Sequence, residues 1–153
     1  FLYLQRTCYG GKVEGQNFGV SVGLPARFDV TKLAPVLEEL HERLSGVVIE
    51  CLPWAELLQR YDRPGTLFYL DPPYWGSEDD YGKGLFTRDD FAALSEALRG
   101  LRGGFILSIN DVPEIRRLFS WARVKPVNTT YRIAGKAQSA GELIITPRGR
   151  GVR

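Results

Sequence analysis

The strongest constraint on the fold is an alternation of short apolar runs with amphipathic segments. The apolar runs VVIEC, TLFYL and GFILSI lie at 47–51, 66–70 and 104–109, and a segment with apolar residues at helical spacing follows each of them. Strands that alternate with helices form a parallel sheet, with the helices as right-handed crossovers. The sequence therefore predicts an α/β fold whose sheet is covered by helices on both faces.

Elements at the two ends complete this prediction. A helix is expected over residues 29–46, capped by Asp29 or Thr31 and ended by Gly46. Its apolar positions at helical spacing are Leu33, Val36, Leu37, Leu40 and Leu44. Residues 1–23 have no helical period, which predicts loop and short strand. The late segments RVKPVNTTYRI and GELIIT predict a closing antiparallel hairpin, with AGKAQSAG as its loop.

Composition excludes several classes of protein. The 153 residues are 44% hydrophobic and 25% charged, as in ordinary globular domains, and no apolar stretch is long enough to span a membrane. No secretory signal opens the chain, so we expect a cytoplasmic protein in which Cys8 and Cys51 are buried thiols rather than a disulfide. The single histidine, His41, falls on the surface of the predicted helix. This disfavours zinc chemistry, and we expect no metal site.

The stretch LFYLDPPYWG, residues 67–76, ends a strand abruptly. Proline has no N–H and a fixed φ, and it pushes the residue before it out of the helical region. Asp71 and Pro72 are therefore held extended just past the strand end. The loop presents one carboxylate, one free carbonyl and the ring of Tyr74. A purely structural turn is the alternative explanation.

Two neighbouring acceptors suit a planar amino group that is conjugated to an aromatic ring. Asp71 and the Pro72 carbonyl can accept both of its hydrogens and favour a tetrahedral nitrogen, whose lone pair then attacks an electrophilic methyl group. This stabilisation grows as charge develops on the nitrogen, so it acts on the transition state. Tyr74 can stack on the base, which must first flip out if it belongs to duplex DNA.

These residues carry a family resemblance. DPPY resembles the catalytic motif of amino-methyltransferases that use S-adenosylmethionine. Further segments resemble, in the same order, the D12 class of Dam-like adenine-N6 DNA methyltransferases, in particular its phage and prophage members. They are FLYLQRTCYGGKVEGQNFGVSVG, VVIECLPWAELLQRYDRPGTLFYLDPPYWGSEDDYG, FILSIND and GELII. The resemblance covers essentially the whole chain and implies a partial Rossmann-like methyltransferase fold. It implies DNA contacts from residues 1–28, a catalytic core over 29–147 and a basic tail over 148–153.

The resemblance also implies roles for individual residues. The catalytic group is Asp71, Pro72, Pro73 and Tyr74, with Asp71 also near the methionine part of the cofactor. Cys51 and Leu52, at the end of the predicted strand 47–51, match the place that holds the cofactor's adenine. The family more often has an acidic–aromatic pair near here, where this chain has Leu52–Pro53. No metal takes part.

Contacts with double-stranded DNA are implied for a separate group of residues, namely Arg6, Lys12, Asn17 and Tyr81. The net charge of +2 does not by itself indicate a nucleic-acid partner. Ordinary surface charge is the alternative for Arg6 and Lys12, and a solvated end is the alternative for the basic tail. Tyr81, with Glu78, would shape the substrate pocket or simply belong to a solvated loop.

Asn110 and Asp111 directly follow the strand expected at 104–109. The carboxyl ends of parallel strands share one rim of a sheet, so these residues should lie beside the DPPY loop. Two interpretations are equally good at this point. The pair belongs to the active rim, or it caps the helix that follows.

The glycine loop with which the family's cofactor site begins is not recognisable in the sequence. The chain also has no methionine and starts at Phe1, so we expect a piece of a longer enzyme rather than a processed protein. Such a piece would bind the cofactor weakly and expose a sheet edge. We therefore expect self-association as a homodimer, or a missing N-terminal half that another chain supplies.

The expected function is methyl transfer from S-adenosylmethionine to the N6 amine of a flipped-out adenine in DNA. One alternative is an RNA guanine-N2 methyltransferase, because related motifs methylate other exocyclic amines. The other alternative is a catalytically silent DNA-binding or assembly module. The sequence predicts neither the DNA target nor the role, be it in restriction–modification, phage protection or regulation.

Overall fold

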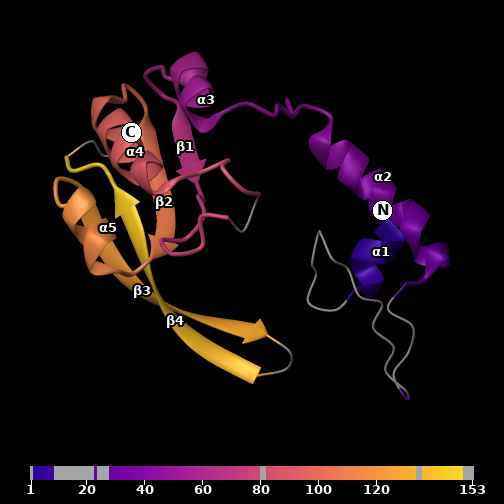
Figure 1. The fold of residues 1–153 in the computed structure, drawn as a ribbon. Helices are drawn as coiled ribbons and strands as arrows, with labels where there is room; N and C mark the ends of the chain where they lie inside the picture. The colour runs from indigo at the N-terminus through magenta and orange to yellow at the C-terminus, as the bar shows by residue number, and fades with distance from the viewer. Residues whose placement is uncertain (1, 9–22, 24–27, 80–81, 134–135, 150–153) are drawn as a thin grey trace. The chain divides into compact units, whose positions relative to one another are not determined.

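The computed structural model of the chain describes residues 2–8, 23, 28–79, 82–133 and 136–149, with the backbone alone over 130–133 and 136–139. These residues fall into two compact units, Phe1–Cys51 and Leu52–Arg153 (Figure 1). No helix within the described ranges is long and apolar enough to cross a membrane.

The first unit contains a short helix α1 (Leu2–Thr7), the 3-10 turn η2 (Val30–Lys32) and the helix α2 (Leu33–Leu44). The predicted cap is confirmed, because the Asp29 carboxylate accepts a hydrogen bond from the Thr31 N–H at 3.0 Å. The side chain of His41 is exposed, as predicted. The expectation of loop and short strand near the start is wrong for α1, because six residues are too few to display a helical period.

The strand predicted at 47–51 is wrong. These residues form no regular element, and Val48 and Ile49 are 77% and 79% exposed. β-Branched residues favour a strand through packing on neighbouring strands, and the run alone does not supply a neighbour. Of the two thiols expected to be buried, Cys8 is buried but Cys51 is exposed, and neither is part of a disulfide.

The second unit is built on a sheet with the order β1-β2-β4-β3. Its strands are β1 (Leu67–Leu70), β2 (Gly104–Asn110), β3 (Arg123–Ile133) and β4 (Lys136–Thr146). β1 and β2 are parallel, while β4 is antiparallel to both β2 and β3. The predicted α/β class and closing hairpin are therefore confirmed. The long hairpin loop is wrong, because Lys136 already pairs with Ile133 and the strands continue almost to the turn.

Three helices accompany the sheet, namely α3 (Trp54–Tyr61), α4 (Arg88–Gly100) and α5 (Pro113–Leu118). A capping box formed by Thr87 and Asp90 begins α4. The Asp90 carboxylate accepts from the hydroxyl and from the N–H of Thr87, both at 2.7 Å, and the hydroxyl contact is the main cause that lowers the pKa of Asp90. The indole N–H of Trp54 donates to the other oxygen of Asp90 at 3.3 Å, which links α3 to the start of α4.

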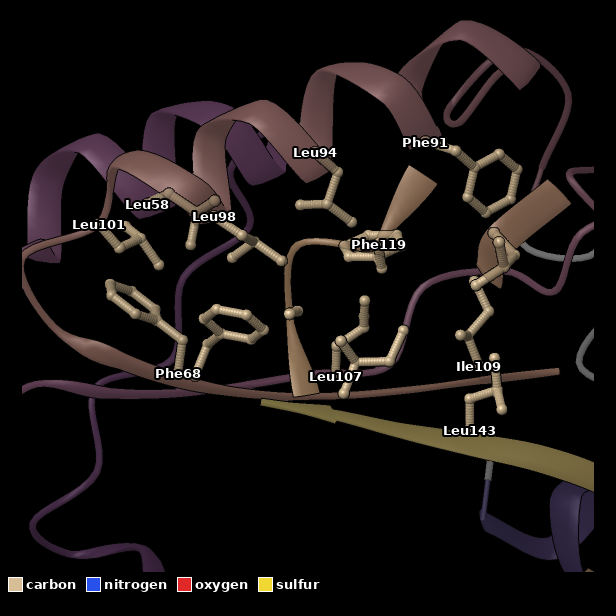
Figure 2. Close-up of a cluster of buried hydrophobic side chains, with 14 of the residues drawn as sticks. Leu58, Phe68, Phe91, Leu94, Leu98, Leu101, Leu107, Ile109, Phe119 and Leu143 are labelled. Carbon is tan, nitrogen blue, oxygen red and sulfur yellow. The ribbon is translucent and has the colours of Figure 1, made fainter. Parts of the chain in front are cut away.

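Side chains from all three helices of this unit join one buried cluster on a single face of the sheet, and Figure 2 shows α3 and α4 over that face. The buried side chains between them are Leu58, Phe68, Phe91, Leu94, Leu98, Phe105, Leu107, Ile109, Ile115, Phe119, Leu143 and Ile145. The opposite face carries Leu67 and Tyr69, which are 51% and 68% exposed. Coverage of both faces is therefore wrong for this unit. It contains a single parallel crossover, through α4, and α3 and α5 pack beside that helix rather than across the sheet.

Candidate active site

The DPPY loop and the end of β2 meet at one rim of the sheet. The side chain of Asn110 forms two hydrogen bonds with the backbone of Trp75. Its Oδ1 accepts from the Trp75 N–H at 2.8 Å, and its Nδ2 donates to the Trp75 carbonyl at 3.0 Å. The predicted shared rim is confirmed. For Asn110 the alternative of a helix cap is wrong, because Val112 occupies the cap position of α5 without a side-chain bond.

Asp111 also does not cap α5. Its two carboxylate oxygens accept from Nε and Nη2 of Arg116, both at 2.6 Å, and this contact lowers the pKa of Asp111. The backbone N–H of Asp111 donates to the Gly141 carbonyl at 3.0 Å. Asp111 thus ties the turn after β2 to both α5 and the hairpin, which is a structural role at the rim.

Asp71 is exposed at the rim, and a hydroxyl from β2 holds one of its carboxylate oxygens. The Ser108 hydroxyl donates to Asp71 Oδ1 at 3.1 Å, and Ser108 Oγ lies 3.2 Å from the hydroxyl of Tyr69. Because Ser108 uses its hydrogen on Asp71, the Tyr69 hydroxyl is the donor of the second bond. Asp71 Oδ2 has no partner among the residues that the structure describes, so it remains available to a ligand.

Tyr74 is fixed by its hydroxyl. The phenol donates to Glu142 Oε1, and Glu142 Oε2 accepts from the Thr129 hydroxyl at 3.0 Å. Glu142 lies on β4 and is only 8% exposed, whereas most carboxylates of this size lie at the surface. The ring of Tyr74 is therefore anchored to the hairpin from its outer end.

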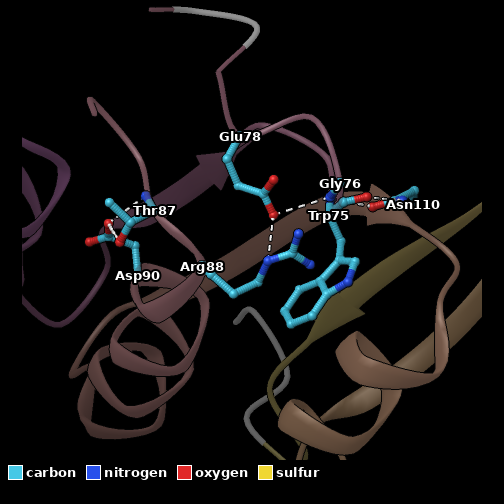
Figure 3. A network of polar contacts seen from close by, with 7 residues as sticks. All are labelled: Trp75, Gly76, Glu78, Thr87, Arg88, Asp90 and Asn110. Carbon is cyan, nitrogen blue, oxygen red and sulfur yellow. Dashed lines mark hydrogen bonds and ion pairs between the residues drawn. The ribbon is translucent and has the colours of Figure 1, made fainter. Parts of the chain in front are cut away.

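A second group of contacts supports the turn that follows Tyr74 (Figure 3). The Arg88 guanidinium lies 4.1 Å from the centroid of the Trp75 ring, and its Nε is 3.0 Å from Glu78 Oε1. The same Glu78 oxygen accepts from the Gly76 N–H at 3.1 Å, which lowers the pKa of Glu78, with the charge of Arg88 adding to the effect. Gly76 has φ +95°, a conformation that favours glycine. These contacts order residues 75–78, while the predicted part of Glu78 in a pocket stays a prediction.

The other residues expected in the site have mixed positions. Pro72 and Pro73 are half-buried directly after β1. Cys51 is exposed and Leu52 half-buried, and neither lies at a strand end, so the expected strand-end position is wrong while their contact with the cofactor's adenine stays a prediction. Arg6 is exposed on α1. The predicted DNA contacts at Lys12, Asn17 and Tyr81 lie outside the described residues.

Sequence reasoning missed Ser108, Glu142 and Arg88. Two of them carried a usable pattern. Ser108 and Asn110 alternate with the buried Leu107 and Ile109, which marks one polar face of an otherwise apolar strand. Glu142 is a charged residue directly before the apolar run at 143–145 of β4, which is unusual for a position that becomes buried. The contact of Arg88 with Trp75 has no comparable pattern.

The rim thus presents a carboxylate whose Oδ2 has no partner in the described part of the chain, and an aromatic ring that is fixed by its hydroxyl. A carboxylate oxygen accepts hydrogen bonds from N–H groups and stabilises developing positive charge. An aromatic face binds a planar ring by stacking. Together they suit a planar heterocycle with an exocyclic amine.

Comparisons with known proteins agree with this chemistry. The family model described as D12 class N6 adenine-specific DNA methyltransferase matches residues 1–133. The chain is also 25% identical over 148 residues to the Type II methyltransferase M.CviBI of Paramecium bursaria Chlorella virus NC1A. The match covers 95% of this chain and 56% of that relative, so the chain spans little more than half of the relative's length. The chain belongs to the D12 class of N6 adenine-specific DNA methyltransferases.

Proposed function

We propose that this chain carries the substrate side of an adenine-N6 DNA methyltransferase, in which Asp71 and Tyr74 receive a flipped-out adenine. The observation that carries the proposal is the free Oδ2 of Asp71 at the rim where Tyr74 is held by Glu142. Pro72 and Pro73 keep the backbone between the two residues rigid. Family membership supports adenine as the base.

In the proposed mechanism Asp71 Oδ2 and the Pro72 carbonyl accept the two hydrogens of the adenine amine. Ser108 occupies Asp71 Oδ1 and thereby sets the direction in which Oδ2 points. As the amine nitrogen formed its bond to the methyl group, the bond between that methyl group and its donor would break and the donor would leave without it. The nitrogen would then carry positive charge, so both acceptors would bind it more strongly, and one of its two hydrogens would be lost as a proton to Asp71 Oδ2. The effect lowers the barrier because it is greater in the transition state than in the ground state.

The methyl donor is proposed to be S-adenosylmethionine, which supplies an electrophilic methyl group when bound. The described residues fit the reacting amine better than they fit this cofactor. Asp71 lies at a strand end, as a residue beside the methionine part would, but Cys51 and Leu52 do not. We therefore assign no residue of this chain to the adenine of the cofactor and derive no step through the cofactor.

The same proposal assigns a different role to each of three segments of the chain. Residues 1–28 would contact DNA, residues 29–147 would form the catalytic core and 148–153 a basic tail. The exposed side chain of Arg6 is compatible with a DNA contact. Arg148 already donates to the carbonyls of Ala122 and Ser120 at 3.1 and 3.0 Å, so its guanidinium supports the fold rather than a free tail.

A second candidate is a DNA-binding or assembly module that does not catalyse the reaction alone. The absence of a strand end at Cys51 and Leu52 favours it. In either case a homodimer, or a further chain that completes the cofactor site, is the proposed partner.

The test is methyl transfer from labelled S-adenosylmethionine to unmethylated duplex DNA, followed by digestion to nucleosides. We expect N6-methyladenine from the wild type, and a rate about 10²–10³ lower for Asp71→Ala, as for other lost preorganised contacts. Label in N2-methylguanine, or full activity of Asp71→Ala, would contradict the proposal. Salt-sensitive DNA binding without methyl transfer would support the silent module instead.

A further inference from the structure

The buried carboxylate of Glu142 is expected to lower the stability of the fold. It is 8% exposed, and its partners within the described part of the chain are two neutral hydroxyl groups, those of Tyr74 and Thr129. No cation among the described residues pairs with it. A buried carboxylate without a counter-charge lowers stability unless its hydrogen bonds compensate, and a neutral side chain would satisfy the same two hydroxyls. The charge therefore calls for an explanation beyond packing.

The location of Glu142 suggests that explanation. Glu142 stands opposite Asn110 in the register of β2 and β4, and Asn110 holds the backbone of Trp75, the residue after Tyr74. The hairpin thus holds the hydroxyl of Tyr74 while β2 holds the backbone next to it. With both ends held, the long axis of the Tyr74 ring is positioned by Glu142 together with Asn110.

We propose that Glu142 is the positioning residue for Tyr74, and that its charge makes the ring a better platform for a base on which positive charge develops. The proposal rests on the proposed function. A hydrogen bond from a phenol to a carboxylate is stronger than one to a neutral acceptor, and it shifts electron density into the ring. The hydrogen stays on the phenol, and no proton is transferred.

The electron density that Glu142 shifts into the Tyr74 ring acts mainly on the transition state. The negative face of an aromatic ring attracts cations, and an electron-rich ring does so more strongly. The adenine is neutral when it arrives and gains positive charge as its nitrogen is methylated. The contribution of Glu142 should therefore appear mainly in kcat, with KM changing little.

The first test compares Glu142→Gln, Tyr74→Phe and the double variant by kcat and KM. Glu142→Gln keeps the shape and an acceptor but removes the charge, and we expect kcat to fall about tenfold, the effect of one hydrogen bond to a charged group. Tyr74→Phe should lower kcat to a similar extent, and the double variant should be no slower than Tyr74→Phe alone. Glu56→Gln is the matched control, because Glu56 forms an exposed pair with Arg60 at 2.8 Å on α3.

A multiplicative loss in the double variant would overturn the proposal, because Glu142 would then act independently of Tyr74. Unchanged kcat in Glu142→Gln would overturn it as well. Wild-type chain that forms no N6-methyladenine would instead refute the proposed function, and a measurement that needs no turnover then decides about Glu142.

That measurement uses a duplex with 2-aminopurine opposite an abasic site, where the base flips at little cost. Stacking on Tyr74 should quench its fluorescence with the wild type and with Glu56→Ala, and Glu142→Ala, which has no acceptor for the Tyr74 hydroxyl, should quench markedly less. Equal quenching by Glu142→Ala, or none by the wild type, would overturn the positioning role. Thermal unfolding of each variant shows whether a lost signal reflects lost folding.

Discussion

The two faces of the sheet in the second unit differ in kind, and neighbouring residues of one strand show it best. Leu107 and Ile109 of β2 are fully buried under the helices, while Ser108 and Asn110 between and beyond them form hydrogen bonds with the DPPY loop. On β4 the same contrast separates Leu143 from Glu142. Strand alternation thus gives the covered face to stability and the open face to the arrangement of the site.

The largest expected effect is a loss of stability from a substitution in the core on the covered face of the sheet. Leu107→Ala removes a fully buried side chain from the core and should lower the free energy of unfolding by about 2–5 kcal/mol. Urea denaturation measures this loss. If the variant were nearly as stable as the wild type, the covered face would not be the source of stability.

Asn110→Ala tests the contact between the two regions. It removes both bonds to the backbone of Trp75 and leaves those groups half-buried, so we expect a loss of about 1–3 kcal/mol in unfolding free energy. Base stacking on Tyr74 should also weaken. Asn110→Asp is the matched comparison, because it keeps an acceptor for the Trp75 N–H but loses the donor to the Trp75 carbonyl. It should be intermediate in stability, and a variant as stable as the wild type would show that the amide is not needed.

Ser108→Ala changes the open face one residue away from Leu107. It removes the hydrogen bond that Ser108 donates to Asp71 Oδ1, so the carboxylate can rotate and Oδ2 no longer points in one fixed direction. Methyl transfer should therefore slow by about tenfold, the effect of one hydrogen bond to a charged group. The unfolding free energy should change far less than in Leu107→Ala. A loss of stability as large as that of Leu107→Ala would remove the distinction between the two faces.

A smaller effect concerns pH and the helix that covers the sheet. The Thr87 contacts lower the pKa of Asp90, so this carboxylate stabilises the folded state above its ordinary pKa of about 3.9 and loses the effect as pH falls through its lowered value. Asp90→Asn should cost about 0.5–2 kcal/mol near neutral pH and nothing at low pH. The check is the unfolding free energy of both proteins from neutral pH downward. A gap that persists in acid would contradict this origin.

The elements of the second unit were predictable because their patterns are local. Periodicity located β1, β2, α3, α4 and α5, and two prolines located the end of β1. The failure at 47–51 has the opposite origin. A β-branched run becomes a strand only beside another strand, and that neighbour cannot be read from the run itself.

The sequence predicted the residues of the DPPY motif in the site but not the residues that hold them in place. Asp71 and Tyr74 were visible because the motif is contiguous. The partner of Tyr74 is 68 residues away, and the contact depends on the register of β4 against β2. Ser108 and Glu142 showed only as polar residues in apolar strands, and which loop they would meet depends on the order of strands in the sheet.

The most direct test of the account is the single-turnover rate of N6-methyladenine formation by Asp71→Asn. This variant keeps the shape of the side chain and can still accept from Ser108, but an amide NH₂ replaces the free acceptor. We predict a rate about 10²–10³ lower than that of the wild type, with an unfolding free energy within about 0.5 kcal/mol. A rate close to that of the wild type would show that Asp71 Oδ2 does not receive the amine, and would contradict the account.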